Sequence, residues 1–376
     1  MTSNNSEERL IKQTILGREE SSDTLSQNIM LRLPAEWESQ QSILISLPDE
    51  SMDWAYMLGE IHECYRGIVK ALTEVHCKVI VLTQNQQYAH EILSSVLTND
   101  ICFVEVPLND TWVRDYGPIT VEETDSEERT LHLKAVDFGF NGWGLKFSAD
   151  KDNLSTKRLF DANALEGLQY LPALSFILEG GSIESDGKGL LLTTSRCLLS
   201  PNRNYYPKEV IERVIKNSLG AKKILWLDHG ALEGDDTDSH IDTLARLCPN
   251  DTILYCGCTD TTDSHYQELN AMKRDLEEMR TLENKPFKLI ELPLPDAIYD
   301  KESGERLPAT YCNYLVTDEA VLVPSYRHPK KDEEARQIVA SVFPNRKVIN
   351  VDCSALIRQH GSLHCATMQI PRRKDR

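Results

Sequence analysis

An alternation of amphipathic helices with short strands rich in Val, Ile and Leu limits the possible folds of this chain more than any other pattern. Residues from about 111 to 205 are mainly β in pattern, with a hairpin turn at Asp186–Gly189. The pattern predicts an α/β fold in a single domain and suggests an internal repeat, although the spacing is uneven and no residue motif recurs. Five helix-then-strand units are predicted: 57–76 with Val79–Leu82, 88–98 with Ile101–Val106, 207–219 with Ile224–Leu227, 266–281 with Phe287–Leu292, and 332–342 with Val348–Val351.

Polar segments flank the predicted catalytic domain, which we place at 29–371. Residues 1–28 carry mainly charged and amide side chains, and we expect a flexible extension there. Residues 372–376 form a basic tail that we expect to be solvated. The sequence has no apolar run of 18 residues and no basic, then apolar, secretory start, so we expect a cytoplasmic protein that does not enter a membrane.

Charge and cysteine spacing narrow the classes of partner. The formal net charge of −18 would repel phosphates, which argues against nucleic acid and favours a small cation. The same charge also fits a protein that is merely kept soluble, so it permits a function without identifying one. The ten cysteines include no paired C-x-x-C set, which argues against a zinc ribbon or a disulfide scaffold and predicts reduced thiols.

Four short segments carry polar residues in settings that a solvated loop does not explain well. Each residue has a simpler reading: a turn cap or ion pair for Asp115, a strand-end carboxylate for Glu179, and one buried thiol among ten for Cys365. A calcium loop at 235–242 fails, because the sixth position from Asp236 is Ile241 instead of glycine. The segments are 109–118 with Asp115, 175–181 with Glu179 before two glycines, 235–242 with His240 and Asp242, and 361–369 with Cys365.

Taken together, these residues fit chemistry on a guanidinium group. A guanidinium is planar, cationic and rich in donors, so carboxylates such as Asp115, Glu179 and Asp242 suit its edges. Displacing one of its nitrogens needs a strong nucleophile, for which Cys365 is the candidate. His240 could protonate the departing ammonia and then deprotonate water. Because carboxylates disfavour a nearby thiolate, we expect Cys365 to stay a neutral thiol until the cationic substrate arrives.

Eight short motifs occur in order from about residue 30: Pro34–Trp37, Trp112–Pro118, Phe138–Gly144, Glu179–Gly181, Leu190–Leu199, Asn202–Asn204, Asp238–Asp242 and His364–Thr367. In these motifs and in their order, the chain resembles the agmatine deiminase and bacterial-type peptidyl-arginine deiminase family of guanidino-group-modifying enzymes. The resemblance implies the pentein fold, a five-bladed pseudo-symmetric α/β propeller. The chain departs from many agmatine enzymes at Leu47–Pro48 and in the thinner glycine content of 358–363.

The same resemblance assigns roles to individual residues. It implies that Cys365 attacks the guanidinium carbon to form a covalent thiouronium intermediate, with His240 as general acid and then base. Asp115 and Asp242 would hold the guanidinium, and Glu179 would bind its nitrogen. It implies no metal and no organic cofactor. Further residues expected to line the substrate site are Trp112, Trp143 and Arg203, although core packing explains the tryptophans equally well.

Agmatine is the substrate we expect, with N-carbamoylputrescine and ammonia as products. Other functions stay open: a peptidyl-arginine or other guanidino deiminase, an amidinotransferase that passes the intermediate to an amine, and a non-catalytic pentein that only binds. A homo-oligomer is also possible. The absence of a secretory signal favours a free metabolite over a peptide.

Overall fold

Apolar segments of the sequence form the middle strands of the sheets, where both faces of a strand are covered. The computed structural model describes residues 29–127 and 129–373, so the predicted extension 1–28 and residues 374–376 of the tail lie outside the described residues. Three strands buried at every position illustrate the rule: β3 (Val79–Thr83), β9 (Leu190–Thr194) and β12 (Thr252–Cys256).

Five sheets are present in the described residues, and one module recurs in all of them. In each module a first strand pairs antiparallel with a second, and the second pairs parallel with a third that follows a helix. A helical crossover is the usual way to connect two parallel strands. The first two modules are β17 (Thr367–Pro371), β2 (Gln40–Ser46), α2 (Leu58–Thr73) and β3, then β5 (Ile119–Thr124), β6 (Thr130–Gly139), α6 (Ser155–Asp161) and β7 (Leu168–Ile177).

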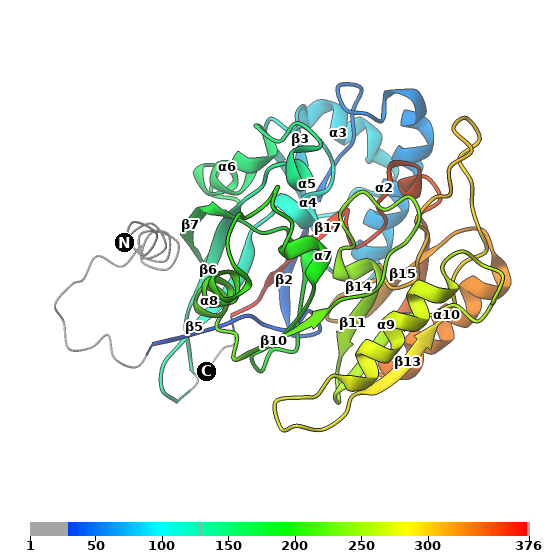
Figure 1. Ribbon diagram of the computed structural model, residues 1–376. Helices are drawn as coiled ribbons and strands as arrows, with labels where there is room; N and C mark the ends of the chain where they lie inside the picture. The colour runs from blue at the N-terminus through cyan, green and yellow to red at the C-terminus, as the bar shows by residue number, and fades with distance from the viewer. Residues whose placement is uncertain (1–28, 128, 374–376) are drawn as a thin grey trace.

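The other three modules follow in chain order. They are β8 (Ile183–Ser185), β9, α8 (Lys208–Leu219) and β10 (Lys223–Leu227); β11 (Ala245–Cys248), β12, α9 (Tyr266–Glu278) and β13 (Lys288–Leu292); and β14 (Leu315–Val316), β15 (Ala320–Ser325), α10 (Pro329–Val342) and β16 (Lys347–Asp352). Helices α6, α9 and α10 lie toward the outside of the molecule, whereas β2 and β17 run near its middle (Figure 1). The α/β fold predicted from the sequence is therefore confirmed.

The predicted units and the observed modules are both five in number but are not the same five. The predicted unit at 88–106 is α3 (Gln86–Ile92) with β4 (Ile101–Glu105), which adds an edge strand to the first sheet. The module formed by β6, α6 and β7 falls in the region predicted to be mainly β. That region also contains the short helices α4 (Val113–Tyr116), α5 (Gly142–Leu145) and α7 (Ser195–Leu198). Helix α6 has only 7 residues, so the sequence shows no clear helical period there and the module was not predicted.

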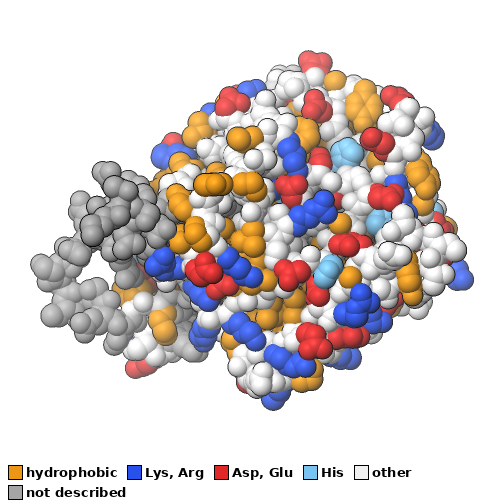
Figure 2. All heavy atoms as spheres, in the orientation of Figure 1, with side chains coloured by type: hydrophobic (Ala, Val, Ile, Leu, Met, Phe, Trp, Pro, Cys, Tyr) orange, Lys and Arg blue, Asp and Glu red, His pale blue; other side chains and the backbone are white. Residues whose placement is uncertain are grey.

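Strands from the two ends of the described chain share a sheet. β17 pairs with β2, with Thr367 opposite Ile45, and β1 (Met30–Arg32) pairs with β5. One hydrophobic cluster of buried residues extends through all five modules. On the face shown in Figure 2, acidic and basic side chains are interspersed. Within the described residues, no helix combines the length and apolar character needed to cross a bilayer.

Candidate active site

The segments that connect one module to the next, called inter-module connections below, all supply residues to a single site. Such a connection leaves the end of a parallel strand and turns toward the next sheet, so the five connections bring distant parts of the chain together. In order, they contribute Asp115 on α4, Glu179 after β7, His240 and Asp242 before β11, Asn313 before β14, and Cys365 before β17. All six are buried.

Two glycines after Glu179 make room for this convergence. A Cβ atom at Gly181 would lie 2.7 Å from His240 Nδ1, 2.8 Å from Asp115 Oδ1 and 3.1 Å from Asp242 Oδ2. A Cβ atom at Gly180 would lie 2.2 Å from the backbone oxygen of Arg114. Only glycine allows so close an approach. The backbone N–H of Gly181 also donates to Asp115 Oδ1 at 3.0 Å.

His240 lies between two of the carboxylates. Its Nδ1 is 3.6 Å from Asp115 Oδ1, and its Nε2 is 3.7 Å from Glu179 Oε2. Neither ring nitrogen makes a hydrogen bond with the described residues, although the side chain is fully buried. Burial opposes the charged ring, but Asp115, Cys197 and Glu179 together outweigh it and raise the pKa of His240 well above its usual value. The ring is therefore protonated at neutral pH and can act as an acid.

Cys365 lies beside Asp242, with 3.8 Å between Sγ and Asp242 Oδ2. The pKa of the Cys365 thiol is raised well above its usual value by burial, and further by Asp242 and Asp115. The direction agrees with the expected neutral thiol in the absence of a cation. Asp242 Oδ1 is buried and has no hydrogen-bond partner among the described residues. A planar cationic donor is the kind of group that could satisfy it.

Different surroundings set the three carboxylates apart. Burial raises the pKa of Asp115, and Asp242 and Glu179 add to the rise while His240 opposes it. Burial would also raise the pKa of Glu179, but the Arg203 guanidinium and His240 bring it below its usual value. Arg203 Nε donates to both Glu179 oxygens, at 2.9 and 2.8 Å. One carboxylate of the three is thus neutralised by a permanent partner.

A cavity of about 190 Å³ leads from the surface down to Cys365. Trp112, Trp143 and Asp115 line it near the thiol, and Trp143 Nε1 donates to Asp115 Oδ2 at 2.9 Å. The backbone of Trp143 is left-handed, with φ 54°, which aims its ring at the site. Arg203 is not among the lining residues; its side chain lies behind Glu179 and is tied to Asp238 Oδ2 at 2.6 Å.

Some features of the site were not anticipated from the sequence. Asn313 Oδ1 accepts from the backbone N–H groups of His364, at 2.9 Å, and Cys365, at 3.2 Å, and so fixes the turn that carries the nucleophile. Asn313 lies in an inter-module connection equivalent to the four that carry the other site residues, and this position is the signal that could have revealed it. The stretch after His240 is a 3-10 turn (Ile241–Thr243), and His240 and Asp242 both reach the site.

Two groups of side chains have the composition of metal ligands: Glu179, Cys197 and His240, and Glu36, Glu184 and His364. In the first group Glu179 is paired with Arg203, and in the second group Glu36 and Glu184 are both paired with Arg246. A guanidinium already neutralises these carboxylates, and its charge opposes a second cation. The arrangement therefore suits fixed ion pairs better than a bound metal.

Comparison with known proteins agrees with this geometry. The model of the Porphyromonas-type peptidyl-arginine deiminase family matches residues 32–371. The chain belongs to this family. An agmatine deiminase of Pseudomonas aeruginosa is 30% identical over 362 residues, which cover 90% of this chain and 95% of the relative.

Solved structures of relatives have the same fold. A cysteine-to-serine variant of the C. jejuni agmatine deiminase with substrate bound is 38% identical with a TM-score of 0.84, covering 93% of this chain and 99% of that one. A candidate arginine deiminase of Porphyromonas gingivalis is 43% identical with a TM-score of 0.83, covering 91% and 98%. The pentein-type α/β fold expected from the resemblance is thereby confirmed for this member of the peptidyl-arginine deiminase family.

Proposed function

We propose that the protein is an agmatine deiminase, which hydrolyses agmatine to N-carbamoylputrescine and ammonia. One observation carries the proposal: the thiol of Cys365 and the carboxylate of Asp115 line one cavity, and an imidazole and two further carboxylates converge on them. Several polar atoms of this group lack partners in the described residues. The names of the relatives support the same activity.

The reaction follows from the positions of these groups. Asp115 and Asp242 hold the guanidinium by charge-assisted hydrogen bonds, and its charge lets the Cys365 thiol lose its proton to solvent. The thiolate forms a bond to the guanidinium carbon, and the bond from this carbon to one terminal nitrogen breaks as His240 donates a proton to the departing ammonia. His240 then takes one proton from water, whose oxygen bonds to the same carbon. The bond from this carbon to Sγ breaks, and the second water proton passes to the departing sulfur. The products are the ureide, ammonia and free thiol.

The charged residues that line the outer part of the cavity affect which substrate tail can bind there. Asp53, Asp110 and Asp236 line it, against Arg358 as the fixed cation. The Arg358 guanidinium is 3.5 Å from Asp300 and lies 5.2 Å from the centroid of the Tyr56 ring. A wall with surplus negative charge suits the ammonium end of agmatine better than the carboxylate of free arginine.

The test is ammonia release by wild-type protein from agmatine, free arginine and an arginine-containing peptide. We expect release from agmatine, and a loss of at least about 10⁴-fold in Cys365→Ser, because the covalent route is gone. Cys102→Ser, at an exposed cysteine, is the matched control and should keep wild-type activity. Release from the peptide alone would keep the chemistry and replace the substrate. No release from any of the three would contradict the proposal.

A further inference from the structure

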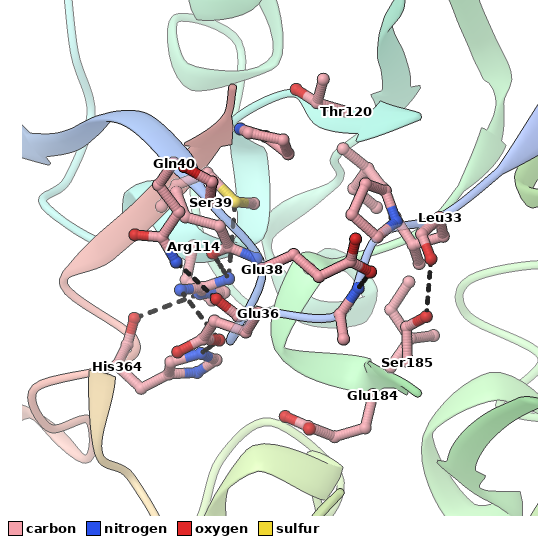
Figure 3. A pocket seen from close by; sticks show the side chains of 18 residues that line it. Leu33, Glu36, Glu38, Ser39, Gln40, Arg114, Thr120, Glu184, Ser185 and His364 are labelled. Carbon is pink, nitrogen blue, oxygen red and sulfur yellow. Dashed lines mark hydrogen bonds and ion pairs between the residues drawn. The ribbon is translucent and has the colours of Figure 1, made fainter. Parts of the chain in front are cut away.

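A second, smaller cavity is lined by three residues that are each adjacent in sequence to a residue of the active site. Asp115, Glu179 and Cys365 belong to the site, whereas Arg114, Gly180 and His364 line a cavity of about 50 Å³ together with Glu36 and Glu184. Figure 3 shows Glu36, Arg114 and His364 grouped on one side of this cavity. The reaction as described uses none of these charged groups.

His364 joins this charged group to the active site. Its Nδ1 lies 2.7 Å from Asp242 Oδ2, and its Nε2 lies 2.6 Å from Glu36 Oε2. Both ring nitrogens therefore face carboxylate oxygens at hydrogen-bonding distance, and Arg246 NH2 also lies 3.1 Å from Nε2. The His364 ring is thus held between the carboxylates of Asp242 and Glu36.

Glu36 is a fixed anchor for this imidazole. The backbone N–H of Val316 donates to Glu36 Oε1 at 2.7 Å, and Arg246 NH2 donates to Glu36 Oε2 at 2.9 Å. Arg246 is itself held by Glu184, by the backbone oxygen of Cys312 at 3.0 Å, and by the Tyr314 ring at 4.4 Å from its centroid. The ring of His364 thus has little freedom to turn.

Asp242 takes its orientation from His364. With Oδ2 bound to the imidazole, Oδ1 is the oxygen left without a partner in the described part of the chain. Asp242 is surrounded by charged or titratable groups from several elements: Asp115, His240, Arg114, Arg246, Cys365 and His364. Burial alone would raise the pKa of Asp242, but the hydrogen bond and charge of His364, together with the charges of His240 and Arg246, bring it below its usual value.

We propose that His364, anchored by Glu36, is a positioning residue that keeps Asp242 charged and turns its free oxygen toward the guanidinium. The inference rests on the proposed function, because it concerns the carboxylate that would bind the substrate head group. It assigns His364 no part in bond making, since its ring nitrogens are engaged by Asp242 and Glu36.

Two substitutions at one position separate this role from simple packing. In His364→Asn the amide nitrogen takes the place of Nδ1 and keeps the bond to Asp242, whereas in His364→Gln it takes the place of Nε2 and keeps the bond to Glu36. Each variant loses one hydrogen bond and the charge. We expect His364→Gln to weaken guanidinium binding by about tenfold and His364→Asn by no more than about threefold.

The measurement is calorimetric binding of methylguanidine, which contains only the head group, to protein carrying Cys365→Ser. We expect binding to His364→Gln to fall more steeply than in the parent as the pH is lowered from 7 to 5, because Asp242 protonates more readily. In active protein the same variant should raise KM for agmatine more than it lowers kcat. Equal losses in the two variants with parental pH dependence, or a larger loss in His364→Asn, would overturn the proposal.

A further variant keeps the test decisive if the substitutions at His364 prevent folding. Glu36→Gln retains the size of the anchor and removes its charge, and we expect about threefold weaker binding of methylguanidine with a steeper pH dependence. Unchanged binding would overturn the proposal. The binding series and the activity can also disagree. If the Cys365→Ser protein and its variants bind methylguanidine with the expected order of affinities but wild-type protein releases no ammonia from agmatine, the proposed function fails and the role of His364 stands.

Discussion

Two clusters of charged side chains are adjacent in this protein and are joined by the hydrogen bond between His364 and Asp242. They differ in how many of their polar atoms have hydrogen-bond or ion-pair partners. In the cluster around Glu36, His364 and Arg246, the carboxylate oxygens face an arginine, the imidazole or a backbone N–H. In the cluster around Asp242, Asp115 and His240, Asp242 Oδ1 and both nitrogens of the imidazole have no partner in the described residues.

The difference shows how a chain can build rigidity and reactivity from the same side chains. A buried charge with all its bonds made fixes the backbone around it, whereas a buried charge with bonds left open is costly unless a ligand supplies them. Residues adjacent in sequence divide between the clusters: Cys365 belongs to the unpaired one, and His364 belongs to the paired one and connects it to Asp242. The paired cluster therefore holds the unpaired one in position for its substrate.

The largest expected effect comes from breaking the paired cluster. Arg246→Gln leaves Glu36 and Glu184 buried without their guanidinium, and we expect the free energy of unfolding to fall by about 3–5 kcal/mol. Urea denaturation measures it. Arg327→Gln is the matched control, because its pair with Asp352 is largely exposed and is worth at most about 1 kcal/mol. Similar losses in both variants would mean that the cluster does not stabilise the fold.

The second effect concerns the thiol in the unpaired cluster. Because burial, Asp242 and Asp115 raise the pKa of Cys365, we expect a bound cation to lower this pKa and to increase the ratio of thiolate to thiol by about thirtyfold. The thiolate absorbance of wild-type protein minus that of Cys365→Ser, titrated with and without methylguanidine, measures the shift. A thiolate fully formed at pH 6 in the free protein would rule out activation by the substrate.

A smaller effect is expected from removing one hydrogen bond to the carboxylate of Asp115. Trp143→Phe removes the indole N–H that donates to Asp115, and we expect kcat/KM for agmatine to fall about tenfold while stability changes little. Steady-state kinetics and thermal unfolding separate the two. Trp226→Phe removes a comparable bond, from Nε1 to Glu212 Oε1 at 2.8 Å, outside the site and should leave kinetics unchanged. Equal kinetic effects of the two variants would contradict the role of Trp143.

The smallest effect is expected at the outer wall of the cavity. Burial raises the pKa of Asp110 and of Asp236 to about 6, so both carboxylates lose charge as the pH falls below that value. We expect KM for agmatine to rise about threefold more than KM for butylguanidine, which lacks the ammonium group, between pH 7 and pH 5. A constant ratio of the two KM values would show that this wall does not bind the amine.

Local patterns in the sequence were sufficient for many elements and for the reactive residues. Strands such as β3 and β10 and helices such as α2 and α8 lie close to their predicted positions, because each has a clear period of its own. His240 and Cys365 were found because their types suit one reaction. Whether they perform it stays a prediction until the variants are measured.

The remainder depends on contacts that no local pattern encodes. Glu36 pairs with Arg246 and His364, which are 210 and 328 residues away, so only the folded chain shows the paired cluster. The module around α6 was hidden by a short helix and by a strand, β7, that is partly exposed along its length. Asn313 has no chemical signature in the sequence and is recognised only from its place in the fourth inter-module connection, before β14.

The pairing of β17 with β2 determines when during biosynthesis the protein can become active. The last strand of the described chain completes the first sheet, and the nucleophile lies two residues before that strand. A contact between such distant segments forms late in folding, because a long loop must close first. The site is therefore not assembled in the nascent polypeptide until the segment that carries Cys365 and β17 has been made and has paired with β2.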